Sequence, residues 1–227
     1  FLELPKSKQI INLGIGTPEV IADIAQEEGK IDQLILTTEA GVHGGLPSGG
    51  LSFGTSINTD TIITQNQQFD FYDGGGIHTA FLGMAQVDQI GDVNVSRFSG
   101  RLAGAGGFVN ISSSSRNIVF CGSFTSSGLI VEVDYEGLKI IQEGKIKKFM
   151  QKVDQITFCA ARANAEGRSV TFITERAVFI LKNGTLQLTE IAPGINLDDQ
   201  ILAHMEFEPN IDKLTTMEKK IFSKTPM

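Results

Sequence analysis

The chain contains 227 residues, of which 41% are hydrophobic and 20% are charged, a composition typical of folded globular proteins and not of disordered ones. Its longest apolar runs have the length of a strand and fall well short of the roughly 20 residues that cross a bilayer, so we expect no membrane-spanning segment. The formal net charge of -7 attracts no polyanion, which argues against nucleic acid as a partner.

The cysteine usage and the chain start bear on the compartment. Cys121 and Cys159 form no Cys-x-x-Cys pair, which indicates two small buried thiols in a reducing, cytoplasmic environment. The sequence opens with Phe1 in place of an initiator Met, and no basic segment followed by an apolar one indicates a secretory signal. These features predict a piece of a longer polypeptide.

The first predicted elements are a strand, a tight loop and a helix. Residues 10–16 form a short apolar segment that ends in glycines. Thr17 is then expected to cap a helix with Pro18 and Glu19 in its first turn. The helix is predicted to end near residue 26, before Gly29, and to bury one face made of Val20, Ile21, Ile24 and Ala25.

The rest of the first half alternates strands and helices. Consecutive apolar residues predict strands buried on both faces at residues 33–38 and 61–64, each paired in parallel. Residues 79–87 are predicted to form a helix that packs on the sheet, and residues 117–121 form one more buried strand. This alternation predicts an α/β fold with a mostly parallel sheet.

The second half predicts antiparallel strands joined by short turns. Asn183-Gly184 indicates a hairpin, because a type I′ turn needs positive φ at both central residues. A capped helix is expected at residues 196–205, and the tail from Pro209 is expected to be a surface extension. With no repeat or linker, one domain over residues 1–227 is predicted. The strands of the second half are expected at residues 129–135, 138–141, 155–160, 169–174 and 177–181.

A carboxylate and a glycine-rich loop follow the second predicted strand. Glu39 comes where this strand ends, and glycines recur from Gly41 to Gly54. Ligands in open α/β sheets bind at the carboxyl ends of the strands, so Glu39 is a candidate site residue. A carboxylate there can act as a base, an acid, a ligand or a nucleophile, and a loop-capping surface glutamate is the structural alternative.

The segment from Gly100 to Asn110 is a second glycine cluster. Consecutive glycines such as Gly106 and Gly107 leave backbone N–H groups able to converge on a developing negative charge, as in an oxyanion hole. A plain tight turn is the alternative for this pattern.

Other motifs are absent or weak. The chain has no Walker phosphate loop and no Gly-x-Ser-x-Gly elbow, and Gly14-Ile15-Gly16 lacks the third glycine of a dinucleotide fingerprint because Glu19 stands there. The three histidines are far apart, so we expect no metal site. A solvated strand end is expected for the basic run of Lys145, Lys147, Lys148 and Lys152.

Four short segments, in the family's order, resemble the β half of the family I coenzyme A transferases, and the resemblance extends over nearly the whole chain. They are Asn12-Leu13-Gly14-Ile15-Gly16-Thr17-Pro18-Glu19, Thr38-Glu39-Ala40-Gly41-Val42-His43-Gly44-Gly45, Ala80 to Val87 with Gly91-Asp92-Val93-Asn94, and Gly104-Ala105-Gly106-Gly107. In the succinyl-CoA branch the nucleophile is followed by Asn-Gly. Here Ala40-Gly41 follows, which favours the propionate and acetoacetate type that acts on short-chain acyl groups.

The resemblance implies a fold and a mechanism. The fold would be a three-layer α/β/α domain of the sugar-phosphate isomerase and CoA-transferase kind, its mostly parallel sheet extended by antiparallel hairpins. Glu39 would be the nucleophile that carries CoA as a glutamyl thioester in ping-pong exchange, Gly107 would offer an oxyanion N–H, and Gly106 would shape the turn. The implied CoA contacts are Gly16, Gly41, Gly44, Gly45 and Gly104.

The resemblance also implies partners. CoA would be a substrate, with no permanently bound cofactor and no metal, and the complete enzyme would be a cytoplasmic homo-oligomer. An α half supplies part of the site in this family, so the chain is expected to be inactive alone. The alternative is a relative that only binds CoA or hydrolyses acyl-CoA.

Overall fold

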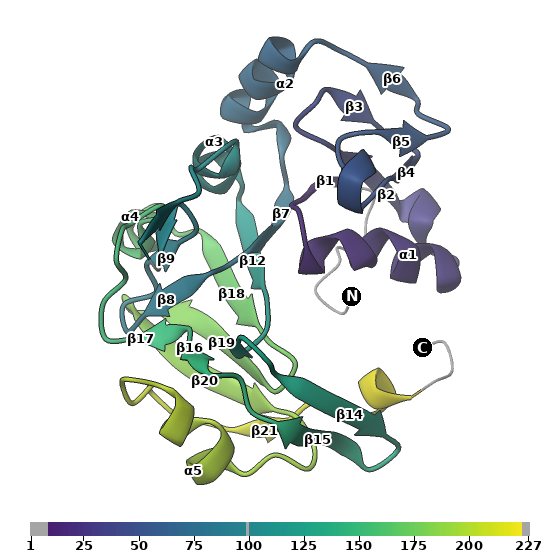
Figure 1. The fold of residues 1–227 in the computed structure, drawn as a ribbon. Coiled ribbons are helices and arrows are strands. Elements are labelled where there is room, and N and C mark those ends of the chain that lie inside the picture. Colours follow the sequence, from purple (N-terminus) through teal and green to yellow (C-terminus); the bar gives the residue numbers. More distant parts are fainter. Residues whose placement is uncertain (1–8, 99, 224–227) are drawn as a thin grey trace. The chain divides into compact units, whose positions relative to one another are not determined.

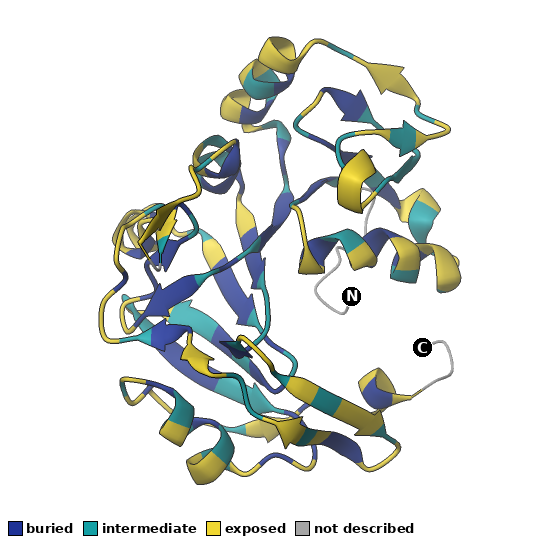
Figure 2. Cartoon of the chain, viewed as in Figure 1, coloured by how far each residue is buried: buried dark blue, intermediate teal, exposed yellow. Residues whose placement is uncertain are grey.

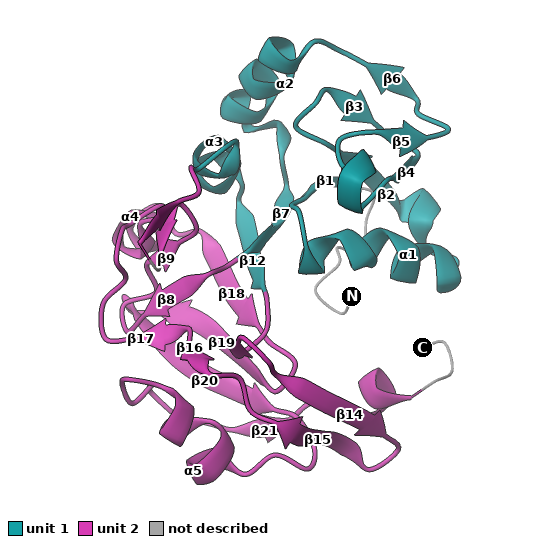
Figure 3. Ribbon diagram, viewed as in Figure 1, with its two compact units in different colours: residues 1–83, 105–121 teal, residues 84–104, 122–227 magenta. Residues whose placement is uncertain are grey.

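The computed structural model describes residues 9–98 and 100–223, and these divide into two compact units. Unit 1 comprises residues 1–83 and 105–121, and unit 2 comprises residues 84–104 and 122–227, so each unit is assembled from two separate stretches of chain (Figure 3). The chain start at Phe1 lies outside the described residues.

Unit 1 is built on a mostly parallel sheet. Strands β12, β7, β1 and β2 pair in parallel in that order, and β3 and β6 continue the sheet antiparallel (Figure 1). Figure 2 shows how deeply β7 is buried. The carboxyl ends of the four parallel strands lie at the same edge of the sheet. The sequence predicts the ligand site at this edge. The strands are β1 (Gln9–Leu13), β2 (Leu34–Thr37), β3 (Val42–His43), β6 (Thr61–Ile62), β7 (Thr79–Gly83) and β12 (Asn117–Cys121).

Short elements connect these strands. The ribbon β4 (Leu46–Pro47) and β5 (Ser56–Ile57) belongs to the glycine-rich loop, and a π-turn at Tyr72–Gly76 joins α2 to β7. The helices are α1 (Val20–Glu27), α2 (Gln65–Phe71) and α3 (Phe108–Ser114), with 3₁₀ turns at Thr17–Glu19, Ile31–Gln33 and Gly50–Ser52.

Two sequence predictions in unit 1 are wrong. Residues 79–87 form no helix: β7 lies between β1 and β12, and β8 (Gln86–Asp88) follows it. The short apolar run at residues 79–83 fits a buried strand as well as a helix. It forms a strand because it pairs with β1 on one edge and with β12 on the other. Residues 61–64 contain the exposed strand β6, which pairs antiparallel with β3 and not in parallel.

The start of α1 is stabilised differently from the prediction. The Thr17 side chain makes no capping bond; instead the Gly16 N–H donates to Glu19 Oε1 at 2.7 Å, and the Gly50 N–H donates to Glu19 Oε2 at 3.0 Å. The Glu19 carboxylate therefore connects the glycine-rich loop to the loop that follows β1. At the other end Gly29 has a φ of 64° after the last turn, which confirms the predicted stop. On the predicted apolar face Val20 is exposed, and Ala22 is buried in its stead.

Unit 2 contains a second set of strands and several small ribbons. Strands β18, β19 and β20 pair antiparallel, and β21 pairs with β20 in parallel. Asn183 and Gly184 have φ of 54° and 77°, which confirms the predicted turn. The strands are β18 (Ser169–Ile173), β19 (Ala177–Lys182), β20 (Thr185–Ile191), β21 (Thr215–Thr216), β8 with β9 (Val93–Asn94) and β17 (Phe149–Met150), β10 (Arg97–Phe98) with β11 (Arg101–Leu102), β13 (Thr125–Ser126) with β16 (Ile146–Lys147), and β14 (Ile130–Asp134) with β15 (Gly137–Gln142).

The helical elements of unit 2 are short. The predicted helix at residues 196–205 is α5 (Leu197–Gln200) followed by a 3₁₀ turn at Leu202–His204. Its cap is confirmed, because Asn196 Oδ1 accepts the Asp199 N–H at 2.9 Å. The strand predicted at residues 155–160 is wrong: only Phe158 bridges to Val93, and helix α4 (Ala160–Ala165) begins at the end of the segment.

Burial corrects three further predictions. The tail is anchored and not a loose extension, because β21 joins the sheet and Met217 and Phe222, the latter in a 3₁₀ turn at Lys219–Phe222, are buried. Cys159 is exposed and Cys121 half-buried, so neither is a core thiol. Lys148 is buried, unlike the rest of its basic run, and burial lowers its pKa to about 8 against the opposing charge of Glu175.

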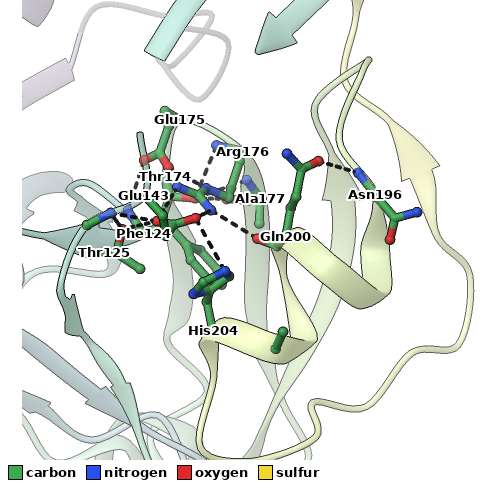
Figure 4. A network of polar contacts seen from close by, with 12 residues as sticks. Phe124, Thr125, Glu143, Thr174, Glu175, Arg176, Ala177, Asn196, Gln200 and His204 are labelled. Atoms are coloured by element: carbon green, nitrogen blue, oxygen red, sulfur yellow. Dashed lines mark hydrogen bonds and ion pairs between the residues drawn. The ribbon is translucent and has the colours of Figure 1, made fainter. Parts of the chain in front are cut away.

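A buried ion-pair network connects distant segments of unit 2 (Figure 4). The fully buried Arg176 guanidinium donates to both Glu143 oxygens, at 2.7 and 3.1 Å, and to Glu175 Oε1 at 2.6 Å. It also donates to the Gln200 carbonyl at 3.0 Å and lies 5.0 Å from the centre of the Phe124 ring. Because these partners come from different elements, the network holds the end of β15, the β18–β19 turn and α5 together.

We expect Glu143→Gln to destabilise the protein by about 2 to 3 kcal/mol at neutral pH. Burial raises the pKa of the Glu143 carboxyl, but the hydrogen bonds from Arg176 and Thr125 and the Gly144 N–H outweigh it and hold the pKa at about 2. A pKa lower in the folded state than in the unfolded state stabilises the fold fully above the unfolded value of 4.5. That contribution is lost as the pH falls from 4.5 towards about 2.

Urea denaturation of wild type and variant at several pH values tests this expectation. The difference in unfolding free energy should be constant above about pH 5 and should shrink as the pH falls from 4.5 towards about 2. Glu136→Gln is the control, because Glu136 is exposed and lies 3.8 Å from Lys139. A Glu143→Gln effect that stays constant with pH would contradict the role assigned to the charge.

Candidate functional site

Glu39 is held in a tight turn at the carboxyl end of β2. The Gly41 N–H donates to the Thr38 carbonyl at 3.1 Å, so Glu39 and Ala40 are the two central residues of the turn. The Thr38 hydroxyl donates to the Gly54 carbonyl at 3.1 Å, which fixes the turn to the glycine-rich loop. The side chain of Glu39 thus projects from a backbone anchored on both sides.

The Glu39 side chain lines a cavity of about 450 Å³ formed within unit 1. Besides Glu39 the cavity has two backbone glycines, one aromatic ring and three carboxamide side chains: Gly106, Gly107, Phe69, Gln65, Asn66 and Asn110. Helix α2 supplies Gln65, Asn66 and Phe69, and the turn and first residues of α3 supply the others. The two predicted segments around Glu39 and Gly107 therefore meet at one place.

The carboxylate lies directly against Gly107. A Cβ built on Gly107 would collide with Glu39 Oε2 and would lie 2.8 Å from Phe69 Cζ, so a larger residue here would displace the carboxylate or the ring. Within the described part of the chain, the Glu39 carboxylate makes no hydrogen bond or ion pair, and the Gly107 N–H meets no acceptor. An unpaired carboxylate beside an unpaired amide donor is suited to covalent chemistry at a carbonyl carbon.

A buried polar network lies at the end of β2 next to this turn. The fully buried Tyr72 hydroxyl donates to Thr37 Oγ1 at 2.9 Å and accepts from Asn12 Nδ2 at 3.1 Å. Thr37 Oγ1 in turn donates to the Ile11 carbonyl at 3.0 Å. Burial raises the pKa of Tyr72, and the charge of Glu39 adds a smaller increase, so the phenol stays protonated. The network links β1, β2 and the π-turn next to the site.

Sequence reasoning missed Tyr72, Phe69 and Asn110 as site residues. A signal existed for the network, because Asn12 and Thr37 are polar residues inside otherwise apolar strands, a pattern that indicates buried hydrogen bonds. The sequence carries no comparable signal for Asn110, because the helix that brings it to the same side as Gly107 is seen only in the structure.

Comparisons with known proteins identify the family. The chain is 45% identical over 212 residues to the acetate CoA-transferase YdiF of Escherichia coli K12 (93% of this chain, 40% of that protein) and 42% identical over 228 residues to the caffeate CoA-transferase of Acetobacterium woodii (98% and 43%). It is 25% identical over 202 residues to one subunit of the succinyl-CoA:3-ketoacid CoA transferase of Helicobacter pylori J99, covering 85% of this chain and 87% of that relative. The chain belongs to the family I CoA-transferases. It corresponds to their β half.

The fold agrees with this assignment. The crystal structure of YdiF apoenzyme from Escherichia coli O157:H7 matches with a TM-score of 0.93 and 42% identity over 99% of this chain and 42% of that one. A YdiF structure described as a thioester complex with CoA matches with a TM-score of 0.92 and 41% identity over 98% and 42%. The glutaconate CoA-transferase of Acidaminococcus fermentans, at 18% identity over 94% and 84% of the two chains, shares the fold alone with a TM-score of 0.71. The predicted α/β class with a mostly parallel sheet is confirmed.

The chain matches only part of the length of its longer relatives. This chain spans about two fifths of the length of the CoA-transferases YdiF and caffeate CoA-transferase. No model of a protein family matches it. Within residues 9–98 and 100–223, no helix is long and apolar enough to cross a membrane, and no group of three or more His, Cys, Asp and Glu residues could hold a metal ion.

Three glycines expected to contact CoA have a packing role in this CoA-transferase chain. Gly41, Gly44 and Gly45 all have positive φ, and a Cβ on them would collide with the Ile63 carbonyl, the Asp60 carboxylate and the Ile57 carbonyl, respectively. The close approach that requires glycine is therefore made by the chain itself, between the residues on either side of β3 and residues 57–63. Contact with CoA remains a prediction for these residues.

Gly16 and Gly104 differ from those three. Both are exposed with positive φ, and a Cβ on either would meet nothing within 4 Å. Gly16 lies in the loop after β1, where its N–H donates to Glu19, and Gly104 belongs to unit 2, where its N–H donates to the Ser96 carbonyl at 3.0 Å. Neither lines the cavity around Glu39.

Proposed function

We propose that the enzyme containing this chain moves CoA between a short-chain acyl-CoA and a carboxylate acceptor, with Glu39 as the covalent carrier. The observation that carries the proposal is the unpaired Glu39 carboxylate against Gly107 in a cavity of the described structure. The relatives named as acetate and caffeate CoA-transferases, and the YdiF structure described as a thioester complex with CoA, support transfer over hydrolysis.

The proposed reaction has two covalent stages. A Glu39 oxygen attacks the thioester carbon, and the tetrahedral intermediate expels CoA thiolate to leave an acyl-glutamyl anhydride. The thiolate then attacks the glutamyl carbonyl and releases the first carboxylate, which leaves a glutamyl-CoA thioester. A second carboxylate reverses these steps and leaves with CoA. The thioester bond energy is conserved throughout, because no step uses water.

Gly107 is the proposed oxyanion donor in this scheme. Its N–H meets no acceptor in the described part of the chain, and its backbone lies beside the attacking carboxylate. A preorganised donor of this kind lowers the barrier by about 3 kcal/mol. Gly106 precedes it with a φ of 53°, which suits its proposed role in shaping the turn.

A partner is part of the proposal. The Helicobacter pylori relative is matched over most of its length by this chain, and a protein named as one subunit of an enzyme implies another. We infer that an α half, within one longer chain or as a separate polypeptide, completes the acyl pocket, and that the chain is inactive without it. CoA then acts as substrate and no resident cofactor is required.

Chemical trapping of the carrier tests the proposal. The full-length enzyme, α half included, is incubated with acyl-CoA without an acceptor and then treated with borohydride or hydroxylamine. Mass spectrometry should find the modification on the peptide that contains Glu39, and only after exposure to acyl-CoA. Modification elsewhere, or acyl-CoA consumption that continues beyond one equivalent per site without an acceptor, would favour the hydrolase alternative.

A further inference from the structure

Asn110 occupies a defined place in the cavity relative to the reacting groups. It lies on α3 three positions after Gly107, so both residues face the same side of the helix and both line the cavity with Glu39. The rise along three helical residues is about 4.5 Å. The backbone of Asn110 therefore lies about that far along the helix from the backbone of Gly107, which carries the proposed oxyanion donor.

Asp73 fixes which end of the Asn110 amide faces the cavity. Asn110 Nδ2 lies 3.2 and 3.0 Å from the two Asp73 oxygens, and Ser114 Oγ lies 3.2 Å from Asp73 Oδ1. An ionised carboxylate only accepts hydrogen bonds, so the NH₂ group must face Asp73 and the amide cannot flip. Oδ1 of Asn110 consequently points away from Asp73.

The Asn110 oxygen is available to a ligand. In the described part of the chain Oδ1 accepts no hydrogen bond, and it is not among the buried polar atoms without a partner, so it is accessible. Among the described residues that line the cavity there is no Lys, Arg or His, and the other polar side chains besides Glu39 are the carboxamides of Gln65 and Asn66. These walls suit a neutral ligand with amide groups and offer nothing to a phosphate.

We propose that Asn110 Oδ1 accepts a hydrogen bond from the amide N–H nearest the sulfur of the thioester substrate, and that Asp73 is the positioning residue that orients it. The proposal rests on the function proposed above. With the thioester carbon between Glu39 and the Gly107 N–H, the extended S–CH₂–CH₂–NH unit is about as long as the rise of about 4.5 Å that separates Gly107 from Asn110 along the helix. Asn110 thus selects thioesters that carry a donor at this distance.

A pair of truncated substrates tests the hydrogen bond directly. The acyl thioester of N-acetylcysteamine has the amide N–H, and the acyl thioester of O-acetyl-2-mercaptoethanol replaces that N–H by an ester oxygen. We expect the full-length wild-type enzyme to prefer the amide compound in kcat/KM by about tenfold, as for one neutral hydrogen bond. Asn110→Ala and Asp73→Ala should reduce the preference towards one.

The controls separate this effect from a general loss of activity. Asn117→Ala makes the same chemical change outside the cavity, on exposed Asn117, and should keep the full preference. A wild-type enzyme that treats both thioesters alike, or an Asn110→Ala enzyme that keeps the preference, would overturn the inference while transfer through a trapped Glu39 leaves the proposed function standing. Absence of both transfer and trapping in wild type would overturn both.

Discussion

Replacing Glu39 by glutamine is expected to lower the rate of CoA transfer by about 10⁴-fold or more, as removal of a covalent nucleophile does in other enzymes. The carboxamide keeps the shape of the side chain but cannot form the anhydride or the thioester. Steady-state exchange between acyl-CoA and a labelled carboxylate, measured with the full-length enzyme, gives the rate. The variant should also lose the modification by borohydride or hydroxylamine.

Two further variants show whether the loss is specific. Glu39→Asp keeps the charge but withdraws the carboxylate by one methylene from Gly107, so we expect a large loss without loss of folding. Glu27→Gln, at the exposed end of α1, makes the same charge change elsewhere and should leave exchange unchanged. Full exchange by the Glu39→Gln enzyme would disprove covalent catalysis at this residue.

Gly107→Ala is expected to reduce kcat by about 10² to 10³-fold. The new Cβ would collide with Glu39 Oε2 and with the Phe69 ring, so the carboxylate is expected to move away from the amide donor. The effect should fall on kcat more than on KM, because the displaced groups are the ones proposed to act in the transition state.

Gly74→Ala provides the matched control for this substitution. A Cβ on Gly74 meets nothing within 4 Å and its φ is not positive, so the variant should exchange CoA at the wild-type rate. Circular dichroism and thermal unfolding of both variants check that α3 still forms. An unimpaired Gly107→Ala enzyme would mean that the carboxylate does not react in the position where it lies here.

Local signals in the sequence are reliable where the backbone itself dictates the residue. The Asn183-Gly184 turn and the stop at Gly29 need positive φ, which few residues adopt, so the residue type reveals the conformation. Apolar runs are less reliable. Residues 79–87 fit a helix and a buried strand equally well, and only pairing of β7 with β1 and β12 decides between them.

The residues of the candidate site also fall into two groups, those that the sequence pattern indicates and those that only the structure brings together. Glu39, Gly106 and Gly107 could be found from the sequence, because a carboxylate after a buried strand and consecutive glycines are unusual residues in unusual places. Phe69, Asp73 and Asn110 are ordinary residues of helices and turns. Nothing in their local pattern shows that Phe69 and Asn110 line one cavity or that Asp73 holds the Asn110 amide. The sequence by itself determined the special backbone positions and the candidate carboxylate. Which side chains surround that group was decided only by folding, since contacts between distant segments depend on sheet order and packing, which no local periodicity records.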